Sequence, residues 1–239
     1  MDRTIDRNRD LCWASCSMLD ETQTTSAAAS SLAALAPAPE CSPHFIVITG
    51  GPGAGKTAVL DIVSRMLNHH IAVLPEAASL LFSGGFPRRS SNAARRAAQR
   101  AIFHVQHELE TLAQEEDHIR CAICDRGTLD GLAYWPGPAE EFFSQLHTTR
   151  EQEFARYQTV IHLRTPTVGY NHQNPLRIET AEEAAALDER IVKAWDGHPR
   201  RFFIENAPDF MSKAQAALDA IVRTLKHNCH AELSFPAVP

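Results

Sequence analysis

The residues from Gly50 to Thr57 read G-G-P-G-A-G-K-T, which fills the phosphate-loop pattern G-x-x-x-x-G-K-S/T. Apolar residues occupy positions 45–48 immediately before this segment, and a helical repeat of apolar residues follows it. This context predicts a buried strand, a glycine turn and a helix whose first amides point at phosphate. The alternative is a glycine-rich turn without a ligand. Because strand and helix signals flank the motif, we expect the chain to bind a nucleoside triphosphate.

The positions of this loop have separate expected tasks. The glycines allow backbone conformations and a close approach of anions that a Cβ would block. Lys56 is expected to bridge the β- and γ-phosphates of ATP or GTP, and the Thr57 hydroxyl is expected to hold Mg²⁺. The other nucleotide-binding candidates are Gly50, Gly51, Pro52, Gly53, Ala54 and Gly55.

Composition narrows the class of protein. The net charge of −6 and the pI near 6.0 argue against a general nucleic-acid binder, which needs a basic surface. No stretch approaches the ~20 apolar residues of a membrane span, and a nucleotide-using chain is expected in the cytoplasm.

The six cysteines have no framework spacing, so free thiols are expected. Cys121 and Cys124 lie three apart on a predicted strand, face opposite sides and are expected to be buried core thiols.

The chain is expected to have one nucleotide-binding domain between two tails. Residues 1–43 are rich in Ser, Thr, Ala and Asp, lack sustained periodicity and predict a disordered or loosely structured N-terminal tail. The P-loop domain is expected over residues 44–228, and a C-terminal tail over 229–239.

Strand and helix signals alternate through the central domain. Strands are predicted at 45–49, 71–74, 119–124, 160–163 and 201–204. Helices are predicted after the phosphate loop, at 92–116, 140–147 and 150–157, after the capping box Thr180-x-x-Glu183, and across the apolar positions 214–225. Residues 164–179 are expected to form a mobile loop. This alternation predicts an α/β fold with a parallel sheet covered by helices on both faces.

Two acidic residues follow predicted strands at the edge where open α/β sheets bind ligands. Asp125 can hold Mg²⁺, directly or through water, or it can cap the next turn; its neighbour Arg126 can reach phosphate. Glu76 can accept a proton from a substrate hydroxyl during phosphoryl transfer. Glu76 can equally be a helix-start carboxylate in the sequence Pro-Glu-Ala-Ala, and the two interpretations stay open.

Further candidates lie around the loop after the fourth strand and in aromatic segments. Arg177 is a candidate to stabilise charge that develops during phosphoryl transfer, whereas Arg164 is interpreted as a surface arginine. Tyr134-Trp135 and the segment 82–86 are candidate walls for a flat acceptor, with ordinary core aromatics as the alternative.

Taken together, the motifs of this chain resemble the NadR/Ttd14-like AAA_28 P-loop NTPase and kinase domain. The resemblance covers about residues 44–228. It rests on the phosphate loop, Pro-Glu-Ala-Ala at 75–78, Asp-Arg-Gly-Thr-Leu-Asp-Gly-Leu-Ala-Tyr at 125–134, Tyr170 with Arg177-x-Glu179, and Leu187-Asp188 with Trp195. It implies a five-stranded parallel sheet in the kinase-like order 2-3-1-4-5 and a lid over the phosphates. Glu76 and Asp125-Arg126 match the acid and the metal motif of related nucleoside kinases, with Gly127 where those kinases usually have Ser.

Two classes of function follow. The first is an ATP- or GTP-dependent phosphotransferase that acts on an unidentified small molecule, with Glu76, Asp125, Arg126 and Arg177 as catalytic candidates. The second is a nucleotide-binding switch or slow NTPase that recruits a protein or an anionic lipid.

Overall fold

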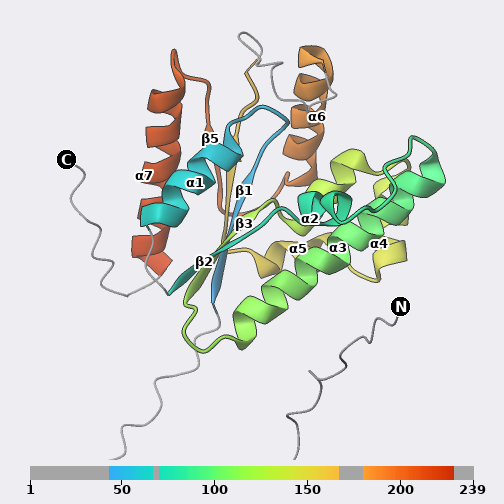
Figure 1. Ribbon diagram of the computed structural model, residues 1–239, viewed down its shortest axis with the longest axis horizontal. Helices are drawn as coiled ribbons and strands as arrows, with labels where there is room; N and C mark the ends of the chain where they lie inside the picture. Colours follow the sequence, from blue (N-terminus) through green and yellow to red (C-terminus); the bar gives the residue numbers. More distant parts are fainter. Residues whose placement is uncertain (1–42, 67–69, 167–179, 229–239) are drawn as a thin grey trace, which may run out of the picture. The chain divides into compact units, whose positions relative to one another are not determined.

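The five strands form one parallel sheet in the order β2-β3-β1-β4-β5 (Figure 1). The structure is a computed structural model that describes residues 43–66, 70–166 and 180–228, all within one compact unit of the chain, residues 40–239. The strands are β1 (His44–Thr49), β2 (Ile71–Leu74), β3 (Cys121–Asp125), β4 (Thr159–Leu163) and β5 (Arg201–Ile204). Every pairing is parallel, so the predicted class and strand order are confirmed.

The third strand begins and ends later than the sequence predicts. Ile119 closes a turn instead, because its N–H donates to the carbonyl of Glu116 over 2.9 Å. At the other end, Asp125 still pairs with Ile48 of β1 and therefore belongs to the strand. Its side chain is consequently held at the carboxyl edge of the sheet.

Helices connect all the strands. They are α1 (Lys56–Met66), α2 (Ala77–Ser83), α3 (Asn92–Glu115), the 3-10 helix η1 (Thr128–Tyr134), α4 (Ala139–Leu146), α5 (Arg150–Arg156), α6 (Ala181–Ala194) and α7 (Phe210–Asn228). The predicted capping box is present, with the Thr180 hydroxyl accepting from the Glu183 N–H over 3.2 Å. The η1 turn was not predicted, because Gly131 interrupts a segment too short to show a helical period.

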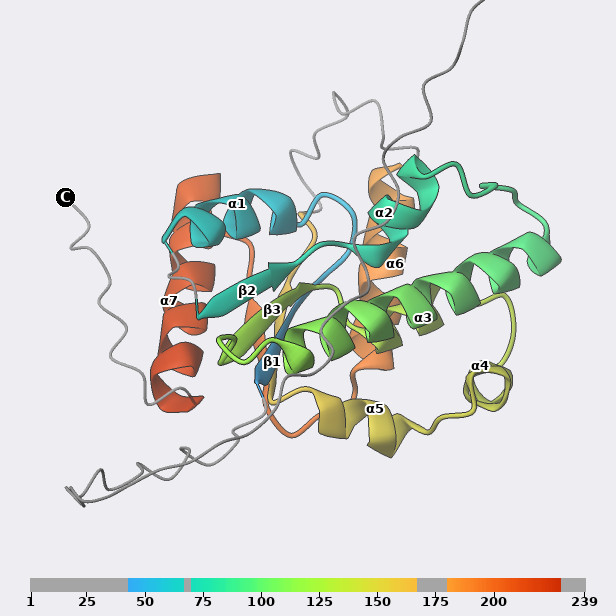
Figure 2. The same cartoon turned by 60° about the horizontal axis from the view of Figure 1, so that its bottom comes forward.

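Two apolar cores lie on opposite faces of the sheet. Figures 1 and 2 show α1 and α7 on one side, and α3 and α6 on the other. Successive β1 residues alternate between these cores: Val47 packs into the α3 and α6 side, and Ile48 into the α1 and α7 side. Cys121 and Cys124 are fully buried on opposite faces, as the sequence predicts.

No helix within the described parts of the chain is long and apolar enough to span a membrane. Apart from Pro43, the tails predicted at 1–43 and 229–239 lie outside the described residues and stay predictions. Residues 167–179, which make up most of the predicted mobile loop, also lie outside them.

Candidate nucleotide site

The phosphate loop, residues 50–55, runs from the end of β1 to the start of α1. Its first glycine could not carry a side chain: Gly50 has a φ of 134°, and an added Cβ would lie 2.1 Å from the Leu163 carbonyl oxygen. The loop is therefore packed closely against the end of β4. The geometry gives the strand–turn–helix arrangement that the sequence predicts.

Lys56 is the buried cation of this loop. Its Nζ donates to the carbonyl oxygens of Gly50 and Gly51 over 2.9 and 3.1 Å. Burial, reinforced by the charge of Arg126, lowers the pKa of the Lys56 ammonium to about 8. The ammonium thus contacts the loop's own carbonyls in the position from which it could reach a phosphate. Thr57 follows it, exposed in the first turn of α1.

Asp125 has an unsatisfied carboxylate oxygen beside the loop. Its Oδ1 is buried and has no hydrogen-bond partner within the part of the chain that the structure describes. Burial raises the pKa of Asp125, and the charges of Lys56 and Arg126 oppose that rise. A buried carboxylate oxygen without a donor is a ligand that suits a hard cation such as Mg²⁺. The Asp125 carboxylate therefore fits the expected metal ligand, and the role of the exposed Thr57 hydroxyl stays a prediction.

Arg126 links three segments around the loop. Its guanidinium donates to Glu76 Oε1 over 2.6 Å, to Asp130 Oδ2 over 3.0 Å and to the Gly50 carbonyl over 3.2 Å. The ring of Tyr134 lies 5.9 Å from its Cζ. Its backbone has a φ of 74°, a left-handed conformation that costs a non-glycine residue about 1–2 kcal/mol. Strain of this kind collects at functional sites, where the surroundings hold it in place.

The side chain of Glu76 faces Arg126 and not the amides of the helix it precedes. Glu76 is the N-cap of α2, but its side chain makes no capping hydrogen bond to that helix's backbone. Arg126 and the Ser79 hydroxyl donate to its two oxygens. Burial acts to raise its pKa, yet the Arg126 charge and these hydrogen bonds outweigh burial and bring the pKa to about 2. Glu76 is therefore ionised at the carboxyl edge of the sheet.

Sequence reasoning assigned no separate role to two buried aspartates of this site. Asp130 accepts hydrogen bonds from the Thr49 hydroxyl and the Trp195 indole, each over 2.6 Å, as well as from Arg126. Asp188 accepts the N–H of Gly51 over 2.8 Å. A signal for Asp188 was present, since it occupies a core-facing position of the helical pattern where an apolar residue is expected.

The structure places some of the other candidate residues at the site and others away from it. Arg177 lies outside the described residues. Arg164, expected to be a surface arginine without a role, pairs with Asp188 Oδ2 over 2.9 Å. Trp135 is not a wall of the site: it is buried in the core, 5.4 Å from the Phe142 ring. Tyr134, by contrast, lies beside Arg126.

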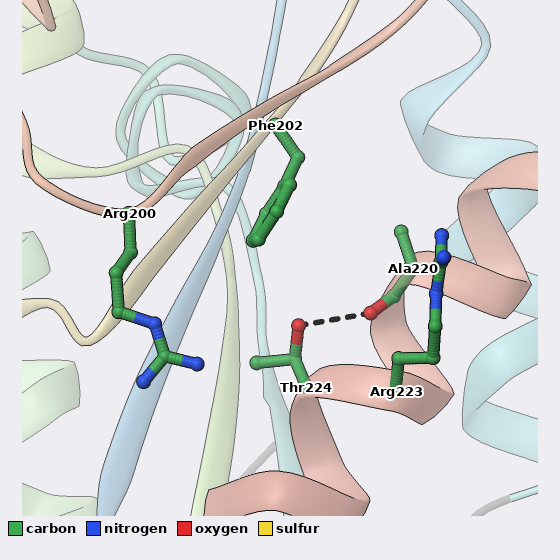
Figure 3. A pocket seen from close by; sticks show the side chains of 5 residues that line it. All are labelled: Arg200, Phe202, Ala220, Arg223 and Thr224. Carbon is green, nitrogen blue, oxygen red and sulfur yellow. Dashed lines mark hydrogen bonds between the residues drawn. The ribbon is translucent and has the colours of Figure 1, made fainter.

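A pocket of about 310 Å³ lies elsewhere, between β5 and α7. Figure 3 shows its lining residues, Arg200, Phe202, Ala220, Arg223 and Thr224. Arg200 directly precedes β5, so the pocket lies near the amino end of that strand. The phosphate loop follows the carboxyl end of β1, and the pocket is therefore separate from the candidate site.

Comparisons with known proteins agree with this geometry. The AAA_28 family, an AAA domain, matches residues 45–213. No curated relative matches the chain in sequence.

Solved kinase structures share the fold. Thymidylate kinase from Candida albicans is 13% identical with a TM-score of 0.55, over 78% of this chain and 93% of that one. Deoxyadenosine kinase from M. mycoides, with bound dATP, is 14% identical with a TM-score of 0.54, over 74% and 99%. NadR in complex with NR is 12% identical with a TM-score of 0.61; the match covers 84% of this chain and 55% of NadR. At these identities the likeness is one of fold.

Proposed function

Because the chain belongs to the AAA_28 family, we propose that it is an ATP- or GTP-dependent phosphotransferase that acts on a small molecule. The observation that carries the proposal is the ionised Glu76 carboxylate, held by Arg126 within one network with the phosphate loop. A carboxylate there can orient an acceptor hydroxyl toward a bound triphosphate. The kinases of thymidylate and deoxyadenosine that share the fold support a nucleoside-like acceptor.

Binding of the triphosphate requires the Lys56 ammonium to exchange carbonyl oxygens for phosphate oxygens. The ammonium holds the Gly50 and Gly51 carbonyls, which are neutral acceptors, and the β- and γ-phosphates offer charged ones. Thr57 and Asp125 would hold Mg²⁺, which neutralises charge on the phosphates when it is bound. Arg126 is close enough to the loop to add a second positive charge beside the transferred group.

Transfer of the phosphoryl group depends more on the orientation of the acceptor hydroxyl than on a strong base. The transition state of phosphoryl transfer is loose, so the hydroxyl proton leaves late. A carboxylate with a pKa of about 2 is a weak base, but it is ionised and can accept the hydrogen bond of the incoming hydroxyl. Glu76 is therefore the residue that orients the acceptor hydroxyl in this proposal. The protein would act in the cytoplasm, where ATP and GTP are available.

The alternative function, a nucleotide-binding switch that hydrolyses slowly and recruits a protein or anionic-lipid partner, rests on the same ion pair. Arg126 and Ser79 already engage both oxygens of Glu76, and a switch would leave them engaged.

The test is acceptor-dependent turnover. The protein is incubated with MgATP or MgGTP and a panel of nucleosides and nucleotides, and nucleoside diphosphate release is followed. A phosphotransferase releases nucleoside diphosphate in proportion to the phosphorylated acceptor. Glu76→Gln lowers transfer by roughly 10²-fold, because the acceptor hydroxyl loses the carboxylate that orients it. Glu140→Gln, at an exposed position of α4, serves as the matched control. Diphosphate release that no acceptor raises, and that Glu76→Gln leaves unchanged, contradicts the proposal and favours the switch.

A further inference from the structure

A buried carboxylate from α6 holds the phosphate loop by its backbone. Asp188 is 2% exposed, and its Oδ1 accepts the Gly51 N–H over 2.8 Å. The loop lies directly against α6 here: a Cβ added to Gly51 would lie 3.0 Å from the Asp188 Cβ and 2.4 Å from the Thr165 Oγ1. Glycine at this position therefore allows the contact with α6 as well as the approach of a phosphate.

The carboxylate of Asp188 is itself firmly held. Nε2 of His162, a fully buried residue of β4, lies 2.9 Å from Oδ1, and Arg164 Nη1 lies 2.9 Å from Oδ2. The Thr165 hydroxyl donates to Oδ1 over 3.3 Å. A buried carboxylate is costly unless charges and hydrogen bonds satisfy it, and here both oxygens are satisfied by the end of β4 and the residues after it. Asp188 thus joins α6, β4 and the phosphate loop.

Binding of a nucleotide would change which contacts hold Gly51. Its carbonyl accepts from Lys56 Nζ over 3.1 Å and from the Ala54 N–H over 3.3 Å, while its N–H is held by Asp188. When Lys56 turns to the phosphates, the carbonyl loses its charged donor. The bond from the Gly51 N–H to Asp188 does not depend on Lys56. Together with the bond from Arg126 to the Gly50 carbonyl, it would continue to hold the peptide between Gly50 and Gly51.

We propose that Asp188 is a positioning residue for the triphosphate, which keeps the first turn of the phosphate loop in place when Lys56 leaves it. The inference rests on the proposed function, because it presumes that the loop binds a triphosphate. Asp188 acts through the Gly51 amide and does not touch the nucleotide. Its negative charge is balanced by Arg164, so a carboxylate can be tolerated behind a loop that binds an anion.

The experiment compares affinity with stability in the full chain. Dissociation constants of Mg-mant-ATP and Mg-mant-GTP are measured by fluorescence for the parent, Asp188→Ala, Asp188→Asn and Leu225→Ala. Thermal unfolding of each variant is recorded in parallel. Leu225 is fully buried near the end of α7, remote from the loop, and serves as a control for general loss of stability.

The expected result is a split between affinity and stability. Asp188→Ala weakens nucleotide binding by about tenfold or more, because the Gly51 N–H loses its acceptor. Asp188→Asn keeps an oxygen at that place and stays within about threefold of the parent. Leu225→Ala lowers the melting temperature but leaves the affinity unchanged. Faster hydrogen exchange of the loop amides in Asp188→Ala, with the rest of the sheet unaltered, supports the same conclusion.

Three outcomes in folded variants overturn the inference. They are an unchanged affinity in folded Asp188→Ala, an Asn variant as weak as the Ala variant, and a loss of affinity in Leu225→Ala that matches its loss of stability. If Asp188→Ala does not unfold cooperatively, Asp188→Ser replaces it. Failure of both variants to fold makes Asp188 a general structural residue and also overturns the inference. A parent protein that binds neither probe contradicts the proposed function itself, which keeps the two failures distinguishable.

Discussion

The Nε of Arg126 donates to Oε1 of Glu76 over 2.6 Å and so joins the carboxyl ends of the adjacent strands β2 and β3. The arginine lies one residue after β3, and the glutamate two residues after β2. This ion pair places an ionised carboxylate and a guanidinium beside the phosphate loop. It also makes the two side chains mutually dependent, so substitutions at either position test the site.

Replacing Arg126 by Ala and by Gly separates its side chain from its backbone. Both variants should lose phosphoryl transfer, because Glu76 and Asp130 lose their shared cation. The free energy of unfolding should be about 1 kcal/mol higher for Arg126→Gly than for Arg126→Ala, because glycine adopts a φ of 74° without strain. Urea denaturation measures this difference. The control is Arg100→Ala, which replaces a partly buried arginine of α3 and should leave phosphoryl transfer unchanged. Equal stability of Arg126→Ala and Arg126→Gly would show that the backbone at this position carries no strain.

Acid should remove the stabilising contribution of Glu76. Its folded-state pKa of about 2 lies below the ordinary value of 4.5, so the ionised carboxylate stabilises the fold above pH 4.5. That contribution is lost as the pH falls from about 4.5 to about 2. We expect Glu76→Gln to cost about 1–2 kcal/mol near neutral pH, after discounting for screening of a partly exposed side chain.

The difference between parent and Glu76→Gln should shrink at acid pH, as measured by the free energy of unfolding in urea at several pH values. A pH-independent difference would mean that the ion pair with Arg126 adds nothing to stability.

Asp125→Asn should weaken the binding of Mg²⁺ more than it destabilises the fold. The substitution removes a negative charge from a buried oxygen that lacks a donor, and burial already raises the pKa of this carboxylate. We expect a higher Mg²⁺ concentration for half-maximal turnover, with unfolding close to that of the parent. Glu76→Gln should leave the Mg²⁺ requirement in place, and a shared shift in both variants would count against Asp125 as the metal ligand.

Nucleotide binding should take up protons on the alkaline side of neutrality. The pKa of Lys56 is lowered to about 8 in the free protein, and a triphosphate favours its charged form. Above pH 8 the binding reaction should therefore protonate Lys56, and affinity should fall as the pH rises through this value. Titration calorimetry in buffers of different ionisation enthalpy measures the uptake. Lys56→Ala should abolish binding; a parent that binds without taking up protons at about pH 8.5 would contradict the lowered pKa.

Deleting residues 1–40 should leave a cooperatively folding, nucleotide-binding domain. The buried residues that form the two apolar cores on the faces of the sheet all lie between Phe45 and Leu225. The truncated chain is expected to keep its melting temperature and its affinity for Mg-mant-ATP. Precipitation or a broad, non-cooperative transition would place part of the N-terminal segment in the fold.

Contiguous residues of this chain determine much of its architecture. The phosphate loop is an eight-residue pattern, and the apolar runs at β1 and β4 alternate with amphipathic helices. Parallel strands joined in this way need helices on both faces, so the layered sheet follows from local periodicity. The same rule places Asp125 and Glu76 at one edge, because parallel strands end on the same side. Short, glycine-interrupted segments such as η1 show no period and could not be predicted.

What only the tertiary structure decided is the choice of partners. Arg126 and Glu76 are 50 residues apart, and Gly51 and Asp188 are 137 apart. Residues so distant meet because strand order and helix packing bring them together, and no periodic signal records which oxygen faces which donor. The sequence left Glu76 open between a helix-start acid and a site residue; the position of Arg126 turned it toward the site. The helical pattern of the sequence also determined that Asp188 would lie on the buried face of α6. Only the packing of that helix against the phosphate loop decided that its carboxylate would hold a backbone amide.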